Sequence, residues 1–197
     1  MSEIRAEKAQ LRARLLRTRR GLTGEEREAA ARALAGTVRG LPEYTHSSTV
    51  AAYVSMGSEP GTGPLIDALR EAGTRVLLPV LLPDNDLDWA EYRGHDALLR
   101  STRGLFEPTG PRLGPEAVTG AQAILLPGLA VDAHGVRLGR GGGSYDRALS
   151  RIERAGTHPA LVVVLYAHEV IDEVPAEAHD RAVDAALTPA GVRRFRA

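Results

Sequence analysis

The stretch "AQAILLPGLAVDAHGVRLGRGGGSYDRALSRIERAGTHPALVVVLYA", residues 121–167, carries the pattern that decides the fold. It opens with an apolar run at 121–127 and closes with a β-branched run at 160–167, and both runs are typical of buried strands. Between them, residues 144–155 are expected to form a helix that ends at Gly156. Buried strands that alternate with helices indicate an α/β fold with a mostly parallel sheet covered on both faces.

The same alternation continues toward the amino terminus. The expected elements there are helices at 3–20, 23–39 and 64–73 and buried strands at 49–56 and 74–82. Thr23 and Glu26 form a capping-box pattern, which predicts where the second helix begins.

The remaining segments complete the expected architecture. Residues 87–92 predict a shorter, partly exposed strand at an antiparallel edge, and residues 95–100 a short helix. Residues 183–188 are expected to supply the last strand. The length of 197 residues suits one hydrophobic core, so we expect a single domain over residues 1–197.

Composition excludes several classes of protein. The formal net charge of +0 argues against non-specific nucleic-acid binding. No apolar run approaches the ~20 residues that a membrane span needs, and the basic amino terminus has no hydrophobic signal core. We therefore expect a cytoplasmic protein without a membrane partner. A monomer is the expected state, with an oligomer as the alternative. The absence of cysteine excludes disulfides, thiolate metal sites and cysteine nucleophiles.

Lys8 is the only lysine among the 25 basic residues of the chain. It is either a surface residue that survived by chance or a compact ammonium needed at a crowded anion site, where Arg cannot replace Lys. The helix at 3–20 is expected to carry its apolar side chains on one stripe (Ile4, Leu11, Leu15, Leu22) and its cations on a different one (Arg5, Lys8, Arg12, Arg19). Lys8 and Arg12 are one helical turn apart and therefore reach the same side.

A glycine-rich loop lies between the strand at 121–127 and the following helix. Its glycines allow positive φ angles, so that successive N–H groups converge on an anion, and Arg140 adds a fixed charge. This arrangement predicts a phosphate-binding loop; the alternative is a flexible surface loop. Named nucleotide motifs do not match, because there is no G-x-x-x-x-G-K-[ST] and Ser144 breaks the dinucleotide pattern.

Asp146 stands in the first turn of the helix after this loop. A carboxylate beside a triphosphate repels it unless a cation lies between them, which suggests Mg²⁺. The alternative is that Asp146 only stabilises the helix amino terminus. Asp184 is a candidate second carboxylate, and its alternative is an ordinary acid at the end of a strand.

Four blocks together resemble the 5-formyltetrahydrofolate cyclo-ligase family. The most specific is "LLPGLAVDAHGVRLGRGGGSYDR" at 125–147, and the others are "EKAQLRARLL" at 7–16, "AAYVSMGSE" at 51–59 and "HDRAVDAALT" at 179–188. The resemblance implies a Rossmann-like three-layer α/β/α fold of the NagB/RpiA/CoA-transferase kind. It also implies ATP- and Mg²⁺-dependent cyclisation of 5-formyltetrahydrofolate to 5,10-methenyltetrahydrofolate, with release of ADP and phosphate.

The resemblance also implies roles for individual residues. The nucleotide-contacting residues would be Lys8, Arg12, Arg137, Leu138, Gly139, Arg140, Gly141, Gly142, Gly143, Ser144 and Tyr145. Those facing the folate would be Val54, Glu59, Arg140, Gly141, Gly142, Gly143 and Ser144; the metal ligands would be Asp146 and Asp184. Lys8 and Arg140 would act in catalysis, as parts of an electrostatic clamp on the transferred phosphoryl group.

One departure from the family pattern concerns Ser144, where many members have a tyrosine. Serine has no ring, so no stacking is expected from this position, whereas serine is a good helix cap. Three aromatic residues, Tyr53, Phe106 and Tyr145, pack either against a bound ring or in the core. Two other functions remain open: a phosphate-binding protein on the same scaffold, such as a sugar-phosphate isomerase or nucleotide sensor, and a folate binder without turnover.

Overall fold

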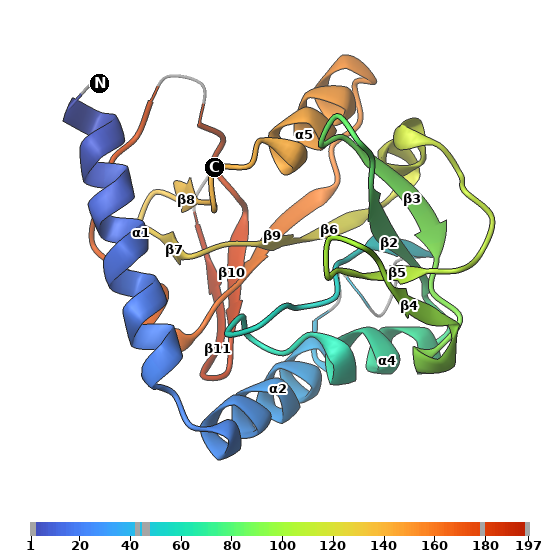
Figure 1. Cartoon of the computed structure of the whole chain (residues 1–197), viewed down its shortest axis with the longest axis horizontal. Coiled ribbons are helices and arrows are strands. Elements are labelled where there is room, and N and C mark those ends of the chain that lie inside the picture. The colour runs from blue at the N-terminus through green and yellow to red at the C-terminus, as the bar shows by residue number, and fades with distance from the viewer. Residues whose placement is uncertain (1–2, 42–43, 45–47, 178–179, 196–197) are drawn as a thin grey trace.

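Figure 1 shows the computed structural model, which describes residues 3–41, 44, 48–177 and 180–195. Its longer helices are α1 (Glu3–Gly21), α2 (Gly24–Arg39), α4 (Gly63–Glu71) and α5 (Ser144–Arg154), and its 3₁₀ helices are η1 (His95–Ala97), η2 (Pro115–Gly120) and η3 (Ala167–Glu169). In the described part of the chain, every helix is too short or too polar to span a bilayer.

A seven-stranded sheet forms the centre of the fold. Its strands are β1 (Thr49–Ala51), β2 (Arg75–Leu81), β3 (Leu87–Glu91), β6 (Ala123–Pro127), β9 (Ala160–Val164), β10 (Ala185–Thr188) and β11 (Gly191–Arg194). Their order is β11-β10-β9-β6-β1-β2-β3, in which the inner five are parallel and both edge strands pair antiparallel. The expected α/β architecture with a mostly parallel sheet is confirmed, and so is the antiparallel edge at β3.

Helices cover both faces of this sheet, because alternate residues of each inner strand point to opposite sides. On one face Val50, Leu78 and Leu125 pack with α2 and α4; on the other, Leu126 and Val163 pack with α5 and η2. Figure 1 shows α2 and α4 below the sheet and α5 above it. Since α5 connects β6 to β9, its amino terminus lies where β6 ends.

Two short hairpins lie outside the sheet. β4 (Leu98–Arg100) pairs with β5 (Phe106–Pro108), and β7 (Ala130–Val131) pairs with β8 (Arg137–Leu138). Leu15 of α1 packs in a separate cluster with Leu129 and Leu138 beside the second hairpin. α1 therefore stands at the side of the molecule, along the hairpin that leads into the glycine-rich loop (Figure 1).

The inner face of α1 differs from the expected apolar stripe. Its buried residues are Lys8, Leu15 and Arg19, whereas Ile4 is exposed. Two members of the expected cationic stripe, Lys8 and Arg19, thus face the protein. The reason is that the surface beneath α1 presents carboxylates, which bind these side chains.

Several expected boundaries are wrong for identifiable reasons. β1 ends at Ala51 because the backbone groups that follow bind a side chain in place of a neighbouring strand. The Thr62 hydroxyl donates to the Tyr53 carbonyl (2.6 Å) and accepts from the Ser55 N–H (2.9 Å). Residues 95–100 form η1 followed by β4 instead of one helix. β10 is not the last strand, since β11 follows it.

The strand β3 was expected to be partly exposed, yet its side chains are mainly buried. Trp89 is fully buried, and it belongs to the same apolar cluster as Val118 of η2 and Leu149 of α5. This edge strand is covered because η2 packs on it. The capping box at Thr23 and Glu26 is present, as expected.

Candidate active site

A pocket of about 630 Å³ opens where the parallel strands end, between α1, the glycine-rich loop and the loop after β1. Most of the residues expected in the site line it: Lys8, Arg12, Val54, Glu59, Arg137, Gly139, Arg140, Gly141, Gly142, Gly143, Ser144, Tyr145 and Asp146. Leu138 does not, because it is buried in the cluster beside α1. Segments far apart in the sequence, such as those of Lys8 and Asp180, which are 172 positions apart, thus meet in one cavity.

The glycine loop, residues 139–143, brings backbone N–H groups to this pocket. Gly141 and Gly143 have φ angles of +91° and +76°, which other residues adopt only with strain. Gly143 is the residue that precedes α5, and no side chain caps the helix there. Ser144 therefore lies inside the first turn and is not the cap that the sequence suggested. The first residues of α5 line the pocket, and no side chain from the cap position binds their N–H groups, which are the donors that helix amino termini offer to anions.

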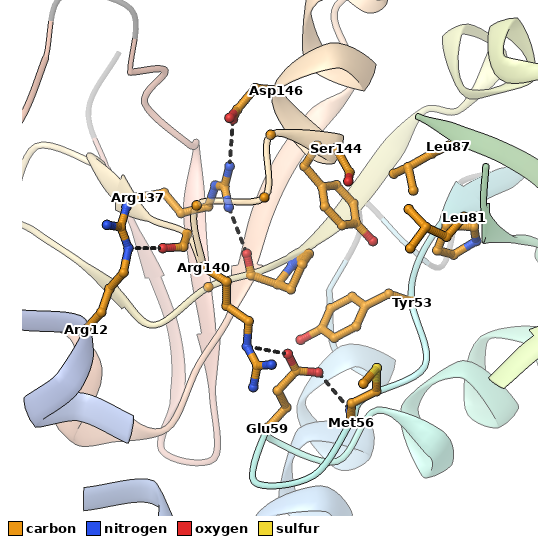
Figure 2. Close-up of a pocket in the computed structure, with 18 of the residues that line it drawn as sticks. Arg12, Tyr53, Met56, Glu59, Leu81, Leu87, Arg137, Arg140, Ser144 and Asp146 are labelled. Atoms are coloured by element: carbon orange, nitrogen blue, oxygen red, sulfur yellow. Dashed lines mark hydrogen bonds and ion pairs between the residues drawn. The ribbon is translucent and has the colours of Figure 1, made fainter. Parts of the chain in front are cut away.

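The cations of α1 approach the loop from the other side. Arg12 donates from Nε to the Gly139 carbonyl (2.9 Å), and Figure 2 shows its side chain reaching toward the loop. Lys8 is almost fully buried, and its Nζ binds Glu177 (3.1 Å) and Asp180 (2.5 Å). The lone lysine is thus no chance surface residue, and in this structure two carboxylates neutralise it.

Arg137 also lines the pocket, on the same side as the glycine loop. It donates to the Pro127 carbonyl (2.9 Å) and lies 3.4 Å from Asp146, whose side chain is 70% exposed (Figure 2). Burial lowers the pKa of the Arg137 guanidinium, and the charge of Asp146 opposes that shift. Asp146 therefore offers an accessible carboxylate beside a fixed positive charge.

Arg140 and Glu59 join the glycine loop to the loop after β1. Their Nε and Oε1 atoms are 3.3 Å apart, and the second Glu59 oxygen accepts the Met56 N–H (2.7 Å), as Figure 2 shows. Arg140 is about half exposed, whereas only 10% of the Glu59 side chain is exposed. Glu59 is thus held rigidly, while the arginine can change partners.

The other side of the pocket is apolar, and we call it the ring slot. Its wall contains Tyr53, Met56, Pro79, Leu81, Leu87, Leu105, Phe106 and Tyr145. Burial raises the pKa of Tyr53 well above its usual value and also raises that of Tyr145, so both phenols stay protonated at neutral pH. The three aromatic candidates all line the pocket; Leu81 and Leu87 were missed, although their position at the turn between β2 and β3 was a usable signal.

The two expected metal ligands do not meet. Asp184 precedes β10 at the end of the sheet where strands begin, and its Oδ2 accepts the Leu161 N–H (2.7 Å). Asp146 lies at the opposite end of the sheet, beside the pocket. Among the residues that the structure describes, no three His, Cys, Asp or Glu side chains form a group that could hold a metal.

A second cavity of about 540 Å³ adjoins the first and shares Arg12 and Arg140 with it. Arg20 and Arg27 also line this cavity, which contains no acidic side chain among its lining residues. We call it the arginine groove. Its charge and its continuity with the pocket suit an anionic extension of a bound molecule.

Known proteins are similar to this chain in sequence and in fold. Residues 4–189 match the model of the 5-formyltetrahydrofolate cyclo-ligase family. The 5-formyltetrahydrofolate cyclo-ligase of Mycolicibacterium smegmatis is 44% identical over 187 residues, covering 92% of this chain and 93% of that one. The enzyme of the same name from Escherichia coli K12 is 33% identical over 178 residues, 88% of this chain and 96% of that one.

A solved structure shows the same likeness in three dimensions. The 5,10-methenyltetrahydrofolate synthetase of Aquifex aeolicus superposes with a TM-score of 0.81 at 31% identity, covering 96% of this chain and 93% of that one.

Proposed function

Because the chain belongs to the 5-formyltetrahydrofolate cyclo-ligase family, we propose that its pocket binds ATP and 5-formyltetrahydrofolate side by side. The reaction is the ATP-dependent cyclisation of 5-formyltetrahydrofolate to 5,10-methenyltetrahydrofolate, with release of ADP and phosphate. The observation that carries the assignment of the site is that one cavity joins a cationic, glycine-rich side to an apolar slot.

ATP belongs on the cationic side. Its phosphates would accept hydrogen bonds from the N–H groups of residues 139–143 and from the first turn of α5. Lys8, Arg12 and Arg140 would supply charge, as the sequence led us to expect. Lys8 would then exchange its contacts with Glu177 and Asp180 for phosphate oxygens.

The folate belongs in the ring slot. Its pterin ring would lie against Tyr53, Tyr145 and Phe106, and Glu59 offers a fixed carboxylate to ring N–H groups. Val54 lines the same wall. The glutamyl carboxylates of the folate would find their nearest cationic surface in the arginine groove.

Of the two expected metal ligands, Asp146 is the one that lies at the pocket, so magnesium would be held there by Asp146. Mg²⁺ needs only one or two protein carboxylates and takes its other ligands from phosphates and water, and Asp146 is accessible at the rim. When bound, the ion would neutralise phosphate charge beside the carboxylate. Asp184 has no place in this proposal, because it lies at the other end of the sheet.

The chemistry requires activation of a formamide, which is a poor electrophile. Transfer of the γ-phosphoryl group to the formyl oxygen releases ADP and converts that oxygen into a leaving group. N10 of the folate then attacks the formyl carbon, and the oxygen departs with its phosphoryl group as phosphate, which can accept the proton that N10 loses. Lys8, Arg12, Arg140 and the loop amides would stabilise the charge of the transferred group, which explains why no acid–base pair is required.

The test mixes the purified protein with ATP, Mg²⁺ and 5-formyltetrahydrofolate and follows the near-ultraviolet absorbance of the methenyl product. Growth of that absorbance together with ADP release supports the proposal. Folate binding without product would instead indicate a binder without turnover. Indifference to folate, with turnover of a sugar phosphate, would indicate an isomerase-like protein.

The monomeric state and the cytoplasmic location expected from the sequence stay predictions. Size-exclusion chromatography with light scattering tests the first of them.

A further inference from the structure

An ion pair lies entirely buried behind the pocket. Arg19 donates from Nε and Nη2 to the two carboxylate oxygens of Glu169, at 2.6 and 2.8 Å, and both side chains are fully buried. Glu169 also accepts the Tyr166 N–H (2.9 Å), and the Arg19 guanidinium lies 5.8 Å from the Tyr166 ring centre. Burial alone lowers the pKa of Arg19, but the hydrogen bonds and charge of Glu169 outweigh that effect and raise it.

Stability alone is a weak reason for such a pair. Removing two charges from water is costly, and apolar side chains of similar volume are often as stabilising as a buried ion pair. In addition, Arg19 Nη1 is buried without a hydrogen-bond partner, which is a further cost. A role in positioning other residues of the site explains the Arg19–Glu169 pair better than stability does.

The pair connects the two sides of the pocket without lining it. Arg19 belongs to α1, which also carries Lys8 and Arg12, and its Nη2 donates to the carbonyl of Gly128 in the pocket wall (2.6 Å).

The second arm of the network runs through Tyr166 toward the folate side. The Tyr166 backbone N–H binds Glu169, and its hydroxyl shares its one proton between the backbone carbonyls of Ser58 and Glu59, at 3.4 and 3.3 Å. One network, buried at the ion pair and partly buried at the Tyr166 hydroxyl, therefore touches the helix that carries the cations and the loop that carries Glu59.

We propose that Arg19 and Glu169 are a positioning pair, which sets the distance between the α1 cations and the Glu59 loop. This inference rests on the proposed function, in which ATP binds to the first and the folate to the second. Phosphoryl transfer needs the γ-phosphate and the formyl oxygen in line, and a misplacement of about 1 Å reduces turnover by about 100-fold. The pair acts through the residues it holds and does not touch the reacting atoms.

The decisive experiment replaces both charges together. The Arg19→Met/Glu169→Leu double variant fills the same space without leaving a charge unpaired, so its melting temperature is expected within about 4 °C of the wild type. Its kcat is expected to fall about 10- to 100-fold, while KM for ATP and for folate change much less. If the double variant has both the kcat and the melting temperature of the wild type, the pair has no positioning role and the proposal is overturned.

A second variant covers the case in which the double variant does not fold. Arg19→Lys keeps the charge but loses the planar fork, so it cannot bind Glu169 at two points and the Gly128 carbonyl at once. We expect a folded protein with reduced kcat. Wild-type kcat in Arg19→Lys would overturn the proposal, and so would failure of both variants to fold, because the pair would then serve folding.

The matched control is Arg17→Lys, an exposed arginine on the same helix away from the pocket, which is expected to leave every parameter unchanged. Failure of the proposed function is distinguishable, because the wild-type protein itself would then form no methenyl product.

Discussion

The two sides of the pocket hold their side chains in different ways. On the cationic side the charges are engaged by carboxylates: Lys8 by Glu177 and Asp180, and Arg140 by Glu59. In the ring slot, Tyr53 and Leu87 are fixed by packing and are almost fully buried. In the proposed complex a nucleotide would therefore exchange ion pairs on entry, whereas the folate ring would meet a preformed wall. Charge changes should affect ATP far more than they affect the fold.

The largest expected effect comes from Lys8→Ala. This change leaves Glu177 and Asp180 at the pocket without the ammonium, so they repel phosphate. KM for ATP is expected to rise about 100-fold, equal to about 2.7 kcal/mol, with a smaller change in KM for folate. Initial rates at varied ATP test this, and Arg14→Ala on an exposed part of α1 is the control. An unchanged KM for ATP would remove Lys8 from the nucleotide site.

Glu59→Gln tests the carboxylate that pairs with Arg140 on the cationic side and that, in the proposed function, also faces the folate. Glutamine keeps an acceptor for the Met56 N–H but loses the charge that faces Arg140 and the folate. KM for folate is expected to rise about tenfold, with little change for ATP, since a charged hydrogen bond contributes about 1.5 to 3 kcal/mol. Fluorescence titration with folate in the absence of ATP measures the same loss directly. A larger effect on ATP than on folate would contradict the division of the pocket.

Asp146→Asn sharpens the assignment of the magnesium ligand. Loss of the Asp146 carboxylate, which is 70% exposed at the rim, should raise the Mg²⁺ concentration needed for half-maximal activity by about tenfold. The matched control is Asp184→Asn, for which we expect an unchanged magnesium titration because Asp184 binds the Leu161 backbone instead. If Asp146→Asn and Asp184→Asn give the same magnesium titration, the position of Asp146 at the pocket does not make it the magnesium ligand.

The smallest expected effect is in the arginine groove. Arg20→Gln removes an exposed cation of the arginine groove. Because ion pairs exposed to solvent contribute little, KM for folate should rise only about two- to fivefold. The effect should weaken at high salt, which screens such pairs. Arg17→Gln is the control. A change in KM for ATP in place of folate would assign the groove to the nucleotide.

Local chemistry explains which parts of the fold could be predicted. The capping box at Thr23 and Glu26 lies within four residues, and the strand at 160–164 is a run of apolar residues, so neither depends on distant parts of the chain. The glycine loop is equally local, and its positive φ angles at Gly141 and Gly143 follow from glycine itself. The expectation of one domain over residues 1–197 stays a prediction.

The errors concern residues whose environment comes from far away. Arg19 has the spacing of a surface cation, yet it is buried because Glu169, 150 positions later, lies beneath α1. Asp184 has a carboxylate that suits a metal ligand, but the register of β10 places it at the end of the sheet opposite to the pocket.

The amino-acid sequence by itself determined the alternation of helices and strands, the glycine loop and the presence of a single lysine, because each is a property of neighbouring residues. Only the tertiary structure decided that Lys8 is neutralised by Glu177 and Asp180, that Arg19 is buried and that Asp146 stands apart from Asp184. The physical reason is that burial and ion pairing depend on which distant segments share a surface, and one-dimensional spacing does not contain that information.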